Sequence, residues 1–133
     1  MSSRDAALFV VLDPASLVRD RRLGWEIASV VRDQHGLGYR VVPVLLLKGL
    51  PADSGVREAA VEAMLRVGVR PAALLELADA SDPRPAWELA RRCGLSLGHS
   101  LLLHDGSEPL QGLQVAGVRR AANVGEMLRG VYA

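Results

Sequence analysis

Two aspartates, each close behind an apolar run, are the residues of this chain best suited to chemistry. Asp13 follows the run from Leu8 to Leu12, and Asp105 follows the run from Leu101 to Leu103 by one residue, His104. If both runs are parallel strands of one sheet, the two aspartates meet at the edge where open α/β sheets bind ligands. Two carboxylates there could hold a hard cation such as Mg²⁺ or act directly on a substrate.

Each residue of this pair also has a purely structural interpretation. Asp13–Pro14 and Asp105–Gly106 are dipeptides that are common in turns. An imidazole can carry a proton near neutral pH, which makes His104 a candidate proton carrier, but a histidine at a strand end usually bonds to a nearby backbone group. The predicted site therefore depends on both aspartates lying at the ends of neighbouring strands.

The elements that must position these residues alternate between short apolar runs and amphipathic stretches. The sequence predicts strands at 8–12, 41–47, 73–77, 101–103 and 118–122, and helices at 23–34, 56–67, 86–92, 109–116 and the C-terminus. Strands separated by helix-length segments indicate right-handed βαβ units and a sheet covered on both faces. We therefore expect residues 1–133 to form one three-layer, Rossmann-like α/β domain with a mostly parallel sheet of about five strands.

Composition argues against several classes of protein. Half of the residues are hydrophobic and the net charge is +1, which favours a compact soluble core over disorder. Basic residues are scattered and aromatic residues are few, so the pattern typical of nucleic-acid binding is missing. The apolar runs are too short for a signal peptide or a membrane span, and Cys93 is the one cysteine. We expect a cytoplasmic protein that binds neither nucleic acid nor membrane.

Two segments resemble the haloacid dehalogenase-like (HAD) phosphohydrolase superfamily. Residues 104–117, HDGSEPLQGLQVAG, are similar in spacing to the family pattern G-D-S-x-x-D-x-x-x-A-x-x-A-G. Residues 81–95, SDPRPAWELARRCGL, are similar to the family pattern K-P-x-P-x-x-F-x-x-A. The order of strands extends the resemblance over nearly the whole chain. Only one helix fits between Asp13 and the second strand, so the resemblance implies a HAD-like fold without a cap domain.

The resemblance implies a role for each matching acid. In the family, the first aspartate attacks phosphorus, and Mg²⁺ is held by that aspartate, by the backbone carbonyl two residues later and by an acid of the fourth motif. Carried over, Asp13 is the nucleophile of an active member. Asp13, the backbone carbonyl of Ala15 and Asp105 are then Mg²⁺ ligands, with Glu108 one position before the missing second acid.

The departures from the family fall on the catalytic machinery. The D-x-D motif reads Asp13-Pro14-Ala15, and Ala15 cannot transfer a proton, a function worth about 10² to 10⁴ in rate. The family lysine is replaced by Asp82, whose charge repels phosphate, and the second acid of the fourth motif by Pro109. We therefore expect a catalytically degenerate HAD-like protein with a binding or assembly role and weak Mg²⁺ affinity.

The alternative is a divergent Mg²⁺-dependent phosphatase that uses Asp13 as nucleophile. His104 or Glu108 would supply the proton, and Lys48 or Arg84 the missing positive charge. Lys48 is the sole lysine and follows the second strand, although a lysine at a strand end often serves only to keep that end solvated. Besides Lys48 and Arg84, the residues expected to bind a substrate are Gly106 and Ser107.

Two further interpretations remain open. A receiver-like signalling domain is also doubly wound, but its acidic pair usually lies on the first strand, and Lys48 is not in the late position that such a domain needs. A homodimer or another protein partner is reasonable because the stretches 41–50 and 110–118 carry few charges. Trp25 and Trp87 are expected to be anchors in the core or in an interface.

Overall fold

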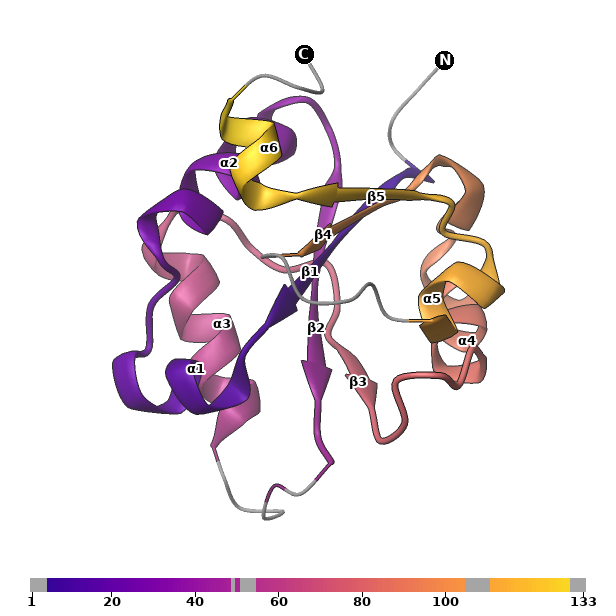
Figure 1. Cartoon of the computed structure of the whole chain (residues 1–133), viewed down its shortest axis with the longest axis horizontal. Helices are drawn as coiled ribbons and strands as arrows, with labels where there is room; N and C mark the ends of the chain where they lie inside the picture. Colours follow the sequence, from indigo (N-terminus) through magenta and orange to yellow (C-terminus); the bar gives the residue numbers. More distant parts are fainter. Residues whose placement is uncertain (1–4, 49, 51–54, 105–110, 130–133) are drawn as a thin grey trace.

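Five parallel strands form the centre of the structure, in the order β3-β2-β1-β4-β5 (Figure 1). The computed structural model describes residues 5–48, 50, 55–104 and 111–129. The strands are β1 (Ala7–Leu12), β2 (Arg40–Leu46), β3 (Leu75–Leu77), β4 (Leu101–His104) and β5 (Arg120–Asn123). The helices are α1 (Pro14–Asp20), α2 (Trp25–Gly36), α3 (Val56–Arg66), α4 (Arg84–Cys93), α5 (Gln111–Ala116) and α6 (Val124–Leu128). The predicted three-layer, Rossmann-like architecture is confirmed.

The helices cover both faces of the sheet, which explains why β1 is apolar throughout. Leu8, Val10 and Leu12 pack on one side with the buried residues of α1, α2, α3 and α6. Ala7 and Phe9 pack on the other side with those of α4 and α5. Figure 1 shows these two groups of helices on opposite sides of the strands. A strand buried on both faces needs no alternation of polar and apolar residues.

The strand order places a topological switch point between β1 and β4. From β1 the chain builds outward through β2 to β3, then crosses back to add β4 and β5 on the other side. Leu8, Phe9 and Val10 pair in register with Leu101, Leu102 and Leu103. In sheets of this order, ligands bind outside the carboxyl ends of the strands at this point.

The segment between β1 and β2 contains two helices, α1 and α2, so the expectation of a single helix there was wrong. Pro14 opens α1 directly after Asp13, because a proline at the first helical position has a suitable φ and needs no donor there. Arg21, at φ 52°, ends the helix. Leu17 of α1 is buried in the core next to α3, so α1 is part of the helical layer that also contains α2, α3 and α6.

The structure narrows two further expectations about packing. Trp25 is 75% exposed and Trp87 is 48% exposed, so neither is a core anchor, and an interface role for them stays a prediction. The stretch 41–50 includes most of β2, which is buried between β1 and β3 and so cannot be an interface there. Pro43 is tolerated inside β2 because pairing with β3 begins only at Val44.

Among residues 5–48, 50, 55–104 and 111–129, the helices are all too short or too polar to cross a bilayer.

Gly112, in the first turn of α5, touches the segment that follows β3. Its N–H donates to the carbonyl of Ala80 at 2.8 Å. A β-carbon at this position would lie 2.6 Å from the carbonyl oxygen of Asp82 and 2.9 Å from that of Ala80. Because both atoms belong to the backbone, they cannot move aside as a side chain could.

We predict that Gly112→Ala lowers the free energy of unfolding by about 1 to 3 kcal/mol, the usual cost of overpacking. Gly36→Ala is the matched control, because no atom lies within 4 Å of the added methyl group at the end of α2. The control should leave stability unchanged or raise it by up to about 1 kcal/mol. Urea denaturation followed by circular dichroism measures both, and equal effects of the two substitutions would contradict the close contact.

Candidate functional site

The carboxyl ends of the strands bring polar residues from distant parts of the chain to one side of the sheet, which we call the carboxyl edge. Asp13 follows β1, Lys48 lies after β2, and Asp79 lies after β3. His104 and Asn123 are the last residues of β4 and β5 and are paired in register. Because β1 and β4 are neighbours, Asp13 and His104 flank the switch point.

Asp13 presents its carboxylate to solvent at the start of α1. Its backbone carbonyl accepts the N–H of Leu17 at 3.1 Å, and its side chain makes no capping bond to the helix backbone. Oδ2 accepts a hydrogen bond from Ser16 Oγ at 2.7 Å. This is its only hydrogen bond from a side chain among the described residues, so the carboxylate has lone pairs left for a ligand.

Ala15 also lies at this edge, in the first turn of α1. Carbonyl groups in an α-helix point along its axis and accept hydrogen bonds from the next turn. A cation bound to Asp13 would therefore have to share the carbonyl oxygen of Ala15 with the hydrogen-bond ladder of the helix.

Asp82 and Arg84 form a bidentate ion pair between β3 and α4. Arg84 Nε and Nη2 donate to the two carboxylate oxygens of Asp82 at 3.0 Å each, and the Arg84 N–H donates to Oδ1 at 3.1 Å. These bonds hold the pKa of Asp82 below its ordinary value. Arg84, suggested by the sequence as a phosphate ligand, is therefore already bound to the carboxylate of Asp82.

Asp79 forms a second local motif in the same segment. Its Oδ1 accepts the N–H of Ser81 at 2.9 Å and the Ser81 hydroxyl at 2.8 Å. These two bonds lower the pKa of Asp79, opposed by the charge of Asp82 and assisted by that of Lys48. Lys48, the other candidate phosphate ligand, thus lies within the electrostatic field of Asp79.

The structure brings part of the predicted site together. Asp13, Lys48, Arg84 and His104 all lie at the carboxyl edge, and His104 is half-buried. Asp105, Gly106, Ser107 and Glu108 lie outside the described residues, so the meeting of Asp13 with Asp105 stays a prediction. Within the described part of the chain, no three His, Cys, Asp or Glu side chains are grouped so that they could hold a metal ion.

Sequence reasoning missed two features of this edge. Asn123 accepts the N–H of Gly125 at 2.8 Å and so caps α6. A hollow of about 320 Å³, lined by residues 24–27 and 123–125, lies beside this cap. The second missed feature is the pair of bonds from Ser81 to Asp79. The Asp-x-Ser spacing could have indicated it, because this spacing is typical of an aspartate that bonds the backbone two residues on.

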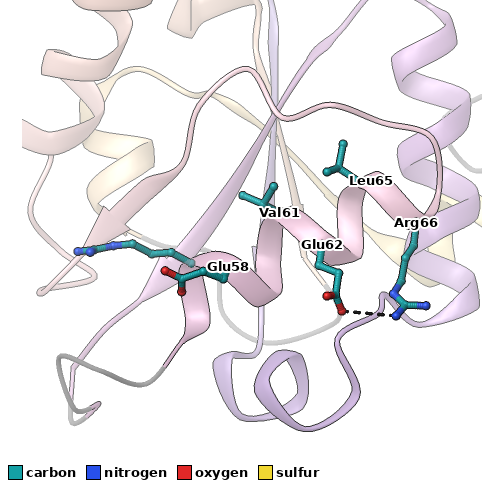
Figure 2. A pocket seen from close by; sticks show the side chains of 6 residues that line it. Glu58, Val61, Glu62, Leu65 and Arg66 are labelled. Atoms are coloured by element: carbon teal, nitrogen blue, oxygen red, sulfur yellow. Dashed lines mark ion pairs between the residues drawn. The ribbon is translucent and has the colours of Figure 1, made fainter.

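The most spacious of the described hollows lies away from the predicted site residues. It measures about 780 Å³, and its described lining residues all belong to α3 (Figure 2).

No family model, curated protein or solved structure matches this chain. The HAD resemblance therefore rests on the sequence motifs alone.

We predict that Ser81→Ala raises the pKa of Asp79 toward its ordinary value of 3.8 without fully restoring it, because the backbone bond from Ser81 remains. Arg84→Gln should raise the pKa of Asp82 in the same way. Side-chain carboxyl ¹³C shifts followed against pH measure both. Each substitution controls for the other, since Ser81→Ala should affect Asp79 more than Asp82.

The same shifts give the sign of a pH effect on stability. Both carboxyl groups have a lower pKa in the folded protein than in the unfolded chain, so their contribution is complete above the unfolded value of about 3.8. It is lost as the pH falls through the folded values. The wild type should therefore lose more stability on acidification than Ser81→Ala, and equal losses would contradict these hydrogen bonds.

Proposed function

We propose that this protein is a catalytically degenerate HAD-like domain whose carboxyl edge binds a ligand or a partner without hydrolysing a phosphoester. The observation that carries the proposal is the balance of charge between β2 and α4. Arg84 is paired with Asp82, and Asp79 adds a second carboxylate in the same segment. A phosphomonoester dianion needs an excess of positive charge, which this corner does not offer.

Weak binding of Mg²⁺ is part of the proposal. The exposed carboxylate of Asp13 is a suitable oxygen ligand, and the family pattern adds the Ala15 carbonyl, Asp105 and Glu108. Mg²⁺ often binds one or two carboxylates and keeps several of its waters, so a partial ligand set suffices for modest affinity. Bound there, Mg²⁺ would supply positive charge for an anionic ligand.

The proposal also covers assembly and location. An assembly role, as a homodimer or with another protein, fits a domain that has lost catalytic groups but kept its scaffold. Val115 of α5 is 65% exposed, so the predicted interface stretch 110–118 offers some apolar surface. The single cysteine, Cys93, fits a reducing cytoplasmic compartment.

A divergent phosphatase is the second candidate, favoured by the position of Asp13 at the switch point. A carboxylate oxygen of Asp13 would attack phosphorus, and the P–O bond to the alcohol would break as His104 or Glu108 donates a proton to the leaving oxygen. Water would then attack the aspartyl phosphate, releasing inorganic phosphate and regenerating the carboxylate.

Calorimetry and a turnover assay test the first proposal against the second. We expect the wild type to bind Mg²⁺ weakly, Asp13→Asn to abolish that binding, and neither protein to hydrolyse an aryl phosphate. Asp20→Asn, at the other end of α1, is the matched control and should bind as the wild type does. Mg²⁺-dependent hydrolysis that Asp13→Asn abolishes would overturn the degenerate assignment.

The pairing of Arg84 with Asp82 leads to a further prediction. Asp82→Asn should strengthen binding of inorganic phosphate severalfold, because it frees Arg84 and removes one negative charge. Asp33→Asn changes the net charge equally on the exposed surface of α2 and should have little effect. Calorimetric titration with phosphate at low salt measures the difference, and equal affinities for the two variants would refute the role given to Asp82.

A further inference from the structure

We propose that the outer face of α3 docks a second copy of this chain, with the two α3 helices antiparallel. This inference rests on the assembly role proposed above and gives it a surface. The α3 face consists of two adjoining rows of residues, each with a spacing of four, so that both lie on one side of the helix. One row is Arg57, Val61 and Leu65, and the other is Glu58, Glu62 and Arg66.

The α3 face is hollowed and partly apolar. The hollow of about 780 Å³ follows this face, and Leu65 is 52% exposed within it. Figure 2 shows Val61 and Leu65 along one edge of this face, and Glu62 and Arg66, joined by an ion pair, along the other edge. A second hollow, of about 260 Å³, adjoins at Arg66 and extends the surface to Arg22 and Leu23.

Arg57 is held rigidly at the N-terminal end of the α3 face. Its guanidinium makes a bidentate ion pair with Glu76 of β3 through Nε to Oε1 and through Nη2 to Oε2, the latter at 2.7 Å. Glu76 neutralises the charge of Arg57 and holds its side chain in place, so the aliphatic stem of Arg57 presents an ordered apolar surface. A partner that packs against an ordered side chain causes little further loss of conformational entropy.

The charges on the α3 face are complementary to those of an antiparallel copy. A helix rises about 1.5 Å per residue, so Glu58 lies about 4.5 Å from Val61 along the axis and Arg66 about 7.5 Å in the other direction. A two-fold axis near Val61 therefore brings Glu58 within side-chain reach of the partner's Arg66, and the symmetric pair forms as well. The same axis places Leu65 against the stem of the partner's Arg57.

The existing contacts of these two residues permit the new pair. Arg66 lies 3.5 Å from Glu62, and both side chains are about half exposed, at 54% and 41%. Glu62 Oε2 is itself buried and accepts no hydrogen bond, so Arg66 stays close to it, and the remaining N–H groups of the guanidinium can bind a second carboxylate. Within the described residues, Glu58 makes no ion pair, and its charge is available to the partner. One helix from each copy buries a small area, so we expect a dimer of micromolar affinity.

Disulfide trapping tests the geometry directly. In a Cys93→Ser background, Val61→Cys places a thiol beside the two-fold axis, and mild oxidation should link two chains. Leu37→Cys, at an exposed position at the end of α2, is the control and should cross-link far more slowly. Equal rates for the two variants would overturn the α3 interface.

Sedimentation of the full chain over a range of concentrations tests the energetics. Leu65→Asp should weaken the dimer by about tenfold or more, whereas Leu37→Asp, at an exposed position at the end of α2, should not. Arg66→Glu alone should weaken it, and Glu58→Arg together with Arg66→Glu should restore it by exchanging both charges. Melting curves establish that each variant is folded.

The outcomes separate this inference from the proposed function. If the wild type dimerises and none of the α3 substitutions weakens the dimer, the α3 interface is wrong and the assembly role belongs to another surface. A strictly monomeric wild type overturns the dimer. Mg²⁺ binding at Asp13 and the absence of turnover are measured independently of either result.

Discussion

The pairing of β1 with β2 on one side and β4 on the other is the constraint on which the rest of the structure depends. All six residues of β1 pair with β2, and its apolar side chains join both halves of the core. A strand enclosed in this way can leave the sheet only by undoing both layers. The direction of β1 therefore determines where Asp13 lies, and the register of β1 with β4 places His104 at the same switch point.

The fold was readable from the sequence where burial alone decides the structure. The apolar runs at 8–12, 41–47 and 101–103 became β1, β2 and β4, because a central parallel strand requires that pattern. Helix α1 was missed because Asp–Pro signals a turn as readily as a helix start, and only the packing of Leu17 beneath α3 distinguishes them. The exposure of Trp25 was not readable from the sequence, because amino-acid type predicts burial only on average.

The candidate site was less predictable than the fold. Sequence position places Lys48 and Arg84 near a phosphate position, but it does not reveal which carboxylate each cation meets. Arg84 reaches the aspartate two residues before it, since the turn at the start of α4 brings their side chains together. Local pairing of this kind neutralises Arg84, which from its position alone is an apparent phosphate ligand. The resemblance drew attention to Asp82, and the geometry shows which side chain Asp82 binds.

The contact at Gly112 connects the segment between β3 and α4 to helix α5. The carbonyls of Ala80 and Asp82 press against the first turn of α5, and the Asp82 carboxylate holds Arg84 at the start of α4. Helices α4 and α5 are thus joined through one short stretch of backbone that also carries the charge pair. A change in residues 80–82 would therefore disturb both helices of this layer and the Asp82–Arg84 pair at the same time.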